Sequence, residues 1–151
     1  MNLWFNCKIN YLKQAENGTI FKKSEVYMLN SLSFTEAEAR LQGLLEEYIP
    51  EYNLDACAKT NITDVIIDES KEFFFKLKVS YVSVDADSGK EKKLSEIYLV
   101  QADTLKESLE VIEERMKGSI VEWEVSNVAK TNVIDVFPYV DEKVIETAAS
   151  E

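Results

Sequence analysis

Apolar and polar residues alternate along two stretches of the chain, and the two stretches match each other. Every second residue is apolar or aromatic, at Phe5, Cys7, Ile9 and Tyr11 in the first stretch and at Phe75, Leu77, Val79 and Tyr81 in the second. Successive side chains of a strand point to opposite faces of a sheet, so this period of two predicts two half-buried strands. Asn17-Gly18 and Ser88-Gly89 follow them and predict hairpin turns, because glycine reaches positive φ at no steric cost.

Each predicted hairpin leads into a second strand and then a helix. The short apolar runs 26–29 and 97–100 predict central strands that are covered on both faces. A third extended segment follows each helix, over residues 54–67 and 120–137, and we expect a break or bulge in it near a Lys-Thr-Asn sequence. Each helix is predicted by a capping box, in which a hydroxyl residue precedes a glutamate by three positions. The two boxes are Ser33 with Glu36 and Thr104 with Glu107.

A sequence repeat accounts for this doubled order of elements. Residues 58–65, Ala-Lys-Thr-Asn-Ile-Thr-Asp-Val, recur 71 positions later as residues 129–136, and six of the eight are identical. We therefore predict an α+β fold of two tandem strand-strand-helix-strand repeats, at about 4–67 and 74–138. A repeat of roughly 70 residues has little core of its own, so we expect both to pack about a pseudo-twofold axis as a single domain, residues 1–140, with antiparallel sheet and two helices. The pattern leaves open whether the strands form one sheet or two.

Composition and charge remove several classes of function. The 151 residues carry 28 acidic and 17 basic side chains, for a formal net charge of −11, and include no histidine. Histidine is the usual acid–base group near neutral pH and the commonest zinc ligand, so histidine-based catalytic triads and zincin sites are excluded. For the binding protein that we favour below, we assign no catalytic residues, no metal site and no cofactor. The negative charge repels phosphate backbones, which excludes generic nucleic-acid binding. The acidic segment 141–151 is expected to fray.

The expected location is the cytoplasm of a bacterial host. Residues 1–12 lack the basic and apolar regions of a secretory signal. No apolar run approaches the ~20 residues that a membrane helix needs, so we expect no membrane partner.

The repeat also tests each cysteine and tryptophan against its partner position. Aliphatic partners predict that both cysteines are small buried hydrophobic residues, while a disulfide or a reactive thiol stays open as an alternative. Aromatic partners favour packing of both tryptophans over a base-stacking platform. The paired positions are Cys7 with Leu77, Cys57 with Val128, Trp4 with Phe74, and Trp123 with Tyr52.

Two sets of polar residues are doubled as well. The first set is Lys59, Thr60, Asn61 and Asp64 with Lys130, Thr131, Asn132 and Asp135. These residues either satisfy backbone groups at a bulge and cap a turn, or meet across the pseudo-twofold axis in a symmetric ligand-binding pocket. The second set is Ser24, Glu25 and Tyr27 with Ser95, Glu96 and Tyr98, which we interpret as packing and ladder residues.

Three segments carry a resemblance to a known family. They are residues 4–8, Trp-Phe-Asn-Cys-Lys, residues 32–40, Leu-Ser-Phe-Thr-Glu-Ala-Glu-Ala-Arg, and residues 134–139, Ile-Asp-Val-Phe-Pro-Tyr. The chain resembles an uncharacterised family of small proteins from Bacteroidetes and from the phages and mobile elements that infect them. This family is labelled only as a domain of unknown function, so the resemblance implies a provenance and no catalytic residues.

We predict a non-enzymatic binding protein, an accessory or counter-defence factor of a phage or prophage. Two partners stay open: a small anionic, nucleotide-like ligand, which the doubled lysines favour, and the basic surface of a host protein, which the net charge favours. The alternative is a structural or virion-associated protein that assembles through exposed strand edges, in which case a homo-oligomer is expected. A metal-dependent enzyme that uses paired Asp64 and Asp135 is the remaining hypothesis.

Overall fold

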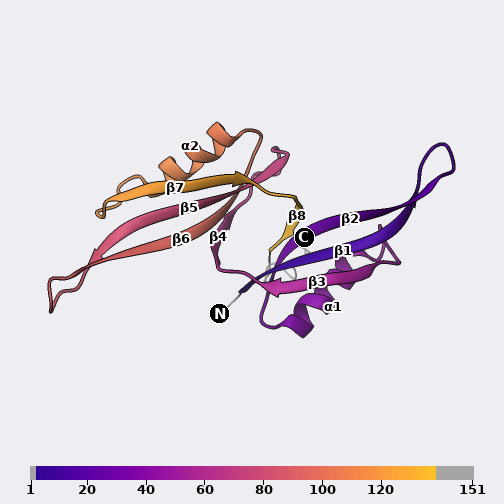
Figure 1. The fold of residues 1–151 in the computed structure, drawn as a ribbon, viewed down its shortest axis with the longest axis horizontal. Helices are drawn as coiled ribbons and strands as arrows, with labels where there is room; N and C mark the ends of the chain where they lie inside the picture. Colours follow the sequence, from indigo (N-terminus) through magenta and orange to yellow (C-terminus); the bar gives the residue numbers. More distant parts are fainter. Residues whose placement is uncertain (1–2, 139–151) are drawn as a thin grey trace, which may run out of the picture. The chain divides into compact units, whose positions relative to one another are not determined.

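The computed structural model describes residues 3–138, which form two compact units. Among these residues, the first unit contains 3–60 and 133–138, and the second contains 61–132. Each unit is a four-stranded sheet with one helix against one face (Figure 1). The predicted tail, residues 141–151, lies outside the described residues.

The first unit contains strands β1 (Leu3–Gln14), β2 (Ile20–Ser31), β3 (Asn53–Lys59) and β8 (Val133–Phe137) and helix α1 (Phe34–Leu45). Its centre is the antiparallel hairpin of β1 and β2, which pair along their whole length. β3 pairs antiparallel with the other side of β1, and β8 pairs parallel with β2. The sheet order is therefore β3-β1-β2-β8.

The second unit contains strands β4 (Ile62–Ile66), β5 (Phe73–Val84), β6 (Glu91–Ala102) and β7 (Trp123–Lys130) and helix α2 (Leu105–Met116). β5 and β6 form the central antiparallel hairpin, β7 extends it beside β5, and β4 runs parallel to β6. The order β4-β6-β5-β7 repeats that of the first unit. The strands predicted to be central, β2 and β6, are internal in both sheets.

The outer parallel strand of each sheet comes from the other sequence repeat. β4 follows β3 along the chain but joins the second unit, and β8 follows β7 but joins the first. The break expected near each Lys-Thr-Asn sequence is thus the point where the chain changes sheets. For this reason the boundaries of the compact units fall inside the repeats predicted at 4–67 and 74–138.

The predicted α+β fold of two tandem repeats is confirmed, and the strands form two sheets. Each sheet is antiparallel apart from one pair, β2 with β8 or β6 with β4. A hairpin turn forces antiparallel pairing, whereas a strand that arrives by a crossover connection is free to run parallel. The sequence pattern indicates the break, but it does not indicate whether the next strand pairs parallel or antiparallel with its neighbour.

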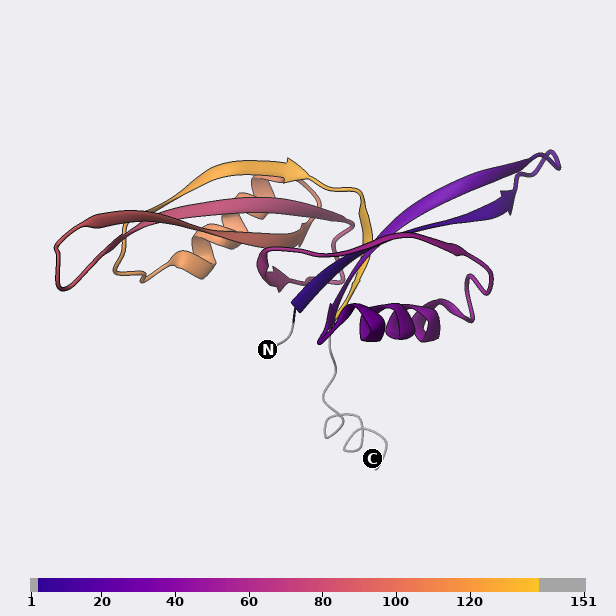
Figure 2. The same cartoon turned by 60° about the horizontal axis from the view of Figure 1, so that its bottom comes forward.

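Both helices begin directly after the predicted hydroxyl residues, which cap them. Ser33 Oγ accepts a hydrogen bond from the backbone N–H of Glu36 at 3.1 Å, and Thr104 Oγ1 accepts one from Glu107 at 3.1 Å. The Glu107 carboxylate binds Lys71 at 2.8 Å. Figure 2 shows each helix against one face of its sheet, with the long β1–β2 and β5–β6 hairpins running past it.

The hairpin turns explain the irregular period of the repeat. Gly18 and Gly89 have φ of +86° and +67°, so both turns use the left-handed backbone that glycine permits. The connection covers residues 15–19 in the first hairpin and 85–90 in the second, which is one residue longer. The first strands are therefore 70 positions apart, while the following elements are 71 apart.

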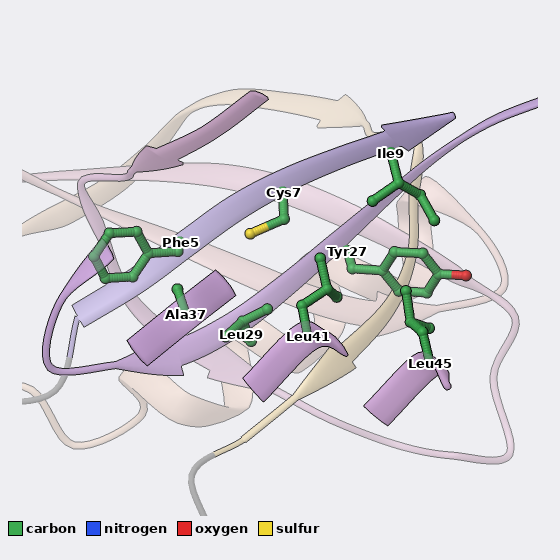
Figure 3. Close-up of a cluster of buried hydrophobic side chains, with 8 residues drawn as sticks. All are labelled: Phe5, Cys7, Ile9, Tyr27, Leu29, Ala37, Leu41 and Leu45. Atoms are coloured by element: carbon green, nitrogen blue, oxygen red, sulfur yellow. The ribbon is translucent and has the colours of Figure 1, made fainter. Parts of the chain in front are cut away.

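A hydrophobic core lies between the helix and the sheet in each unit. In the first unit, Leu41 and Leu45 of α1 pack onto β1 and β2, and the side chains involved are drawn in Figure 3. In the second unit, Ile112 of α2 and Leu77 of β5 have no exposed surface. Each such side chain stabilises the fold by roughly 1.5–3 kcal/mol through burial.

Part of the opposite face of each sheet is also buried. Trp4 and Met28 alternate with the helix-facing residues of β1 and β2 and are only 9% and 2% exposed. Phe74 and Leu99 occupy the matching face of the second sheet and are each 1% exposed. The packing role predicted for Trp4 and its partner Phe74 is therefore confirmed. No helix among the described residues has the length and apolar character needed to cross a membrane.

Candidate functional site

The threonines of the doubled motif directly follow β3 and β7. The backbone N–H and the hydroxyl of Thr60 both donate to the carbonyl oxygen of Trp4, each at 2.8 Å. Thr131 makes the same two bonds to the carbonyl oxygen of Phe74, at 2.9 and 2.8 Å. Since the side chain and the backbone share one acceptor, both threonines hold the start of the crossover in place.

The aspartates of the motif lie on the strands that have crossed. Asp64 Oδ1 accepts a hydrogen bond from the N–H of Val65 at 2.9 Å, and Asp135 Oδ1 accepts one from Val136 at 2.8 Å. Asp64 Oδ2 is also 2.6 Å from Nη2 of Arg115. These bonds fix the carboxylates locally at the entry of β4 and β8.

Within each unit the lysine and the aspartate of the motif lie on opposite edges of the sheet. Lys59 ends β3 and Asp135 belongs to β8, with β1 and β2 between them. Lys130 on β7 and Asp64 on β4 are separated in the same way. Three strand spacings amount to about 14 Å, so no unit brings its lysine and aspartate together.

The remaining motif residues are exposed. Lys59, Asn61 and Asn132 all face solvent. The Nζ atom of Lys130 is 3.5 Å from the centre of the Phe73 ring, a cation–π contact on the edge of the second sheet. The lysine is thus used for local packing at this edge.

An open cavity of about 890 Å³ lies elsewhere, entirely within the first unit. It is lined by α1, by the second half of β1, by Lys22 of β2, and by residues 50–54, which lead into and begin β3. Its chemical character comes from two carboxylates, two phenol rings and one ammonium group, namely Glu38, Glu51, Tyr11, Tyr52 and Lys22. None of the eight predicted ligand-binding residues lines it.

A buried carboxylate fixes one of the phenol rings of this cavity. Glu25 on β2 is only 9% exposed and accepts hydrogen bonds from the hydroxyls of Tyr11, at 2.7 Å, and of Tyr27. Lys23 Nζ approaches the same carboxylate at 3.4 Å. Every oxygen of Glu25 therefore has a partner, and Tyr11 is held with its ring at the cavity.

The ionisation of this cluster follows from its partners. Burial and the hydrogen bond to Glu25 raise the pKa of Tyr11 to about 12, and the same causes raise that of Tyr27. Burial alone would raise the pKa of Glu25, but hydrogen bonds from Tyr27, Tyr11 and Lys23 outweigh it and the pKa is lowered. The cluster thus stays in one state, with charged glutamate and neutral phenols, over a wide range of pH.

The second unit repeats the cluster. Glu96 accepts hydrogen bonds from the hydroxyl of Tyr98 at 2.5 Å and from that of Tyr81 at 3.4 Å. Burial and the bond to Glu96 raise the pKa of Tyr98 to about 12. The doubled Ser-Glu-x-Tyr sequence was the signal for this arrangement, although the sequence indicated only packing and ladder residues there.

The other phenol ring that lines the cavity, that of Tyr52, lies beside the core. Tyr52 packs against the core of the first unit, and burial raises its pKa, with Cys7 and Glu38 as lesser causes. Its partner position holds Trp123, which packs against the core of the second unit. Core packing predicted for this aromatic pair is therefore confirmed.

Comparison with known proteins gives one family and no assigned activity. No curated protein and no solved structure matches the chain. A family model described as a domain of unknown function, DUF4494, matches residues 3–139. The match covers nearly the whole chain, as the resemblance implied, and the chain belongs to the DUF4494 family of uncharacterised proteins.

Proposed function

We propose that this chain is a non-enzymatic binding protein and that the cavity of the first unit receives a cationic group. The observation that carries the proposal is the lining of the cavity, in which Glu38 and Glu51 lie with the rings of Tyr11 and Tyr52. Carboxylates attract a cation by charge. Aromatic faces add about 0.5–2 kcal/mol for each cation placed over a ring, depending on desolvation.

The charge of the protein supports the same choice. Lys22 is the one basic residue at the cavity, against two glutamates, and the whole chain carries −11. A field of this sign raises the encounter rate with basic partners and lowers it with anions. The cavity therefore favours a cation, whereas the anionic ligand predicted from sequence would depend on Lys59 and Lys130, which lie outside the cavity.

The cationic group that we favour is a lysine or arginine side chain on a host protein. An open cavity that connects to solvent suits a side chain presented from another surface. In this proposal the protein acts in the cytoplasm of a bacterial host, as an accessory or counter-defence factor of a phage or prophage. That setting is supported by the resemblance of segments 4–8, 32–40 and 134–139.

Calorimetric titration tests the proposal with three probes: a short peptide that contains lysine and arginine, free spermidine, and a cyclic dinucleotide. The informative variant is Glu38→Gln with Glu51→Gln, which removes both cavity carboxylates. The matched control is Glu110→Gln with Glu122→Gln, which removes the same charge from exposed positions of the second unit.

We expect the peptide to bind the protein and the control, and to bind the cavity variant about tenfold more weakly, equivalent to about 1.4 kcal/mol. Stronger binding of spermidine than of peptide would assign the site to a free amine. Equal loss of affinity in both double variants would show that only overall charge matters, which contradicts the proposal. Binding of the dinucleotide in place of both cations would reverse the sign of the ligand and overturn it.

A further inference from the structure

Cys7 and Cys57 are direct neighbours across the first sheet. Cys7 on β1 and Cys57 on β3 are partners in the antiparallel register. Their Sγ atoms are 3.0 Å apart and both thiols are free. The chain has two cysteines, so the whole cysteine content of the protein is gathered in this one contact.

We propose that Cys7 and Cys57 form a redox-reactive pair, which a low-molecular-weight disulfide converts into an intramolecular disulfide between β1 and β3. This inference is independent of the ligand proposed for the cavity.

The backbone already meets the requirements of such a bond. Directly opposed residues of antiparallel strands have Cα atoms about 4.5–5.5 Å apart, and disulfides span roughly 4.4–6.8 Å between Cα atoms. The sulfur atoms need to approach from 3.0 Å to about 2.05 Å. Because the two Cα ranges overlap, we expect rotation of the side chains, and not a rearrangement of the sheet, to close this gap.

The second unit shows which residues can fill the corresponding pair of positions without cysteine. Leu77 and Val128 occupy the corresponding places and are partners in the corresponding register. An aliphatic pair therefore satisfies the packing of the fold. Two cysteines at the same pair of positions fill the same space and can in addition form a disulfide, because their thiols are direct neighbours.

The two thiols differ in their exposure to solvent, and this difference determines which of them reacts first. Cys57 is partly exposed on the outer strand β3, whereas Cys7 has no exposed surface. Burial raises the pKa of the Cys7 thiol, so this residue stays protonated in the resting protein. Since the thiolate is the attacking species, the exchange begins at Cys57.

The reaction is thiol–disulfide exchange in two steps. The Cys57 thiolate attacks one sulfur of the small disulfide, its S–S bond breaks, and one small thiol leaves with a proton. Cys7 then loses its proton and attacks the Cys57 sulfur, and the second small thiol is released. The protein loses two electrons and two protons, and the small disulfide is reduced to two thiols.

The experiment uses oxidised glutathione as the probe and the intact mass of the native protein as the readout. The variants are Cys7→Leu, Cys57→Val and the double variant, which copies the Leu77–Val128 pair of the second unit and keeps an aliphatic core. Alkylation of the remaining thiols after the reaction checks the assignment.

We expect the wild-type monomer to lose the mass of two hydrogens, to keep no glutathione and to lose both alkylatable thiols, all reversed by a reductant. Cys7→Leu should retain one glutathione on Cys57, since it lacks the second thiol, and Cys57→Val should remain unmodified. A wild-type protein that keeps a glutathione adduct, forms a disulfide-linked dimer or stays reduced would overturn the proposal.

Discussion

Arg115 on α2 donates a hydrogen bond from Nη2 to Asp64 Oδ2 at 2.6 Å, and this joins a strand of the first repeat to the helix of the second. The guanidinium carbon also lies 5.4 Å from the centre of the Tyr98 ring. In the first unit, Arg40 on α1 donates to the carbonyl oxygen of Pro138 at 3.2 Å, directly after β8. The only two arginines of the chain thus both fasten a crossed strand to a helix.

Replacement of Arg115 by Ala should loosen β4. The ion pair is half exposed, with side-chain exposures of 43% and 40%, so its loss together with the ring contact should lower the free energy of unfolding by about 1 kcal/mol. Hydrogen exchange should accelerate in β4 and remain unchanged in β7, on the other edge of the sheet. Lys106→Ala on the same helix is the control, and equal exchange in β4 for both variants would contradict the prediction.

The tyrosine clusters should make the protein sensitive to strong alkali. The pKa values of Tyr11 and Tyr98 are raised from 10.0 to about 12 in the folded protein. A raised pKa stabilises the folded state fully below pH 10, and this contribution is lost as the pH rises towards about 12. Denaturant titrations over this interval should show a falling free energy of unfolding. The Tyr11→Phe/Tyr98→Phe variant should show a shallower decline, and parallel curves would argue against the assignment.

Glu25 should make the free energy of unfolding fall as the pH is lowered, whereas the tyrosines make it fall as the pH is raised. Its pKa is lowered from 4.5 in the folded protein, so its stabilising contribution is present above pH 4.5 and is lost as the pH falls through the folded-state value. Glu25→Gln should therefore reduce the dependence of stability on pH below 4.5. Glu16→Gln, in the exposed hairpin turn, serves as the comparison and should keep the wild-type slope in acid denaturation experiments.

Oxidation of the cysteine pair should stabilise the first unit. The bond would close a loop of 50 residues, for which the chain-entropy model gives up to about 4 kcal/mol. Urea titrations of the oxidised and reduced protein should show a higher midpoint for the oxidised form. The Cys7→Leu/Cys57→Val protein should give the same midpoint under both conditions. Destabilisation on oxidation would indicate that closing the bond strains the β1–β3 pairing.

Local features of the sequence predicted the elements and their internal order. The alternation from Phe5 to Tyr11 gave β1, and the hydroxyl residues Ser33 and Thr104 marked the first turns of both helices. The repeat correctly identified Cys7 and Trp4 as buried packing positions, whereas Cys57, which was also predicted to be buried, is partly exposed because it lies on the outer strand β3. These signals are readable because strand period, helix caps and glycine turns depend on residues only a few positions apart.

The candidate site was not predicted from the sequence. The cavity joins Tyr11, Glu38 and Tyr52, which lie on separate elements and share no motif. The doubled Lys-Thr-Asn sequence was conspicuous, yet in the structure its threonines secure the crossover at Trp4 and Phe74. Among the doubled polar residues, Glu25 is the one connected to the cavity, because it accepts a hydrogen bond from Tyr11 in the cavity lining.

The sequence alone determined that the chain contains two similar α+β repeats with a break in the third extended segment of each. Only the tertiary structure decided that the chain changes sheets at Thr60 and Thr131, and that Cys7 faces Cys57. The physical reason is that strand propensity and turn chemistry are local, whereas the choice of a neighbouring strand depends on hydrogen bonds and burial between residues far apart in the chain.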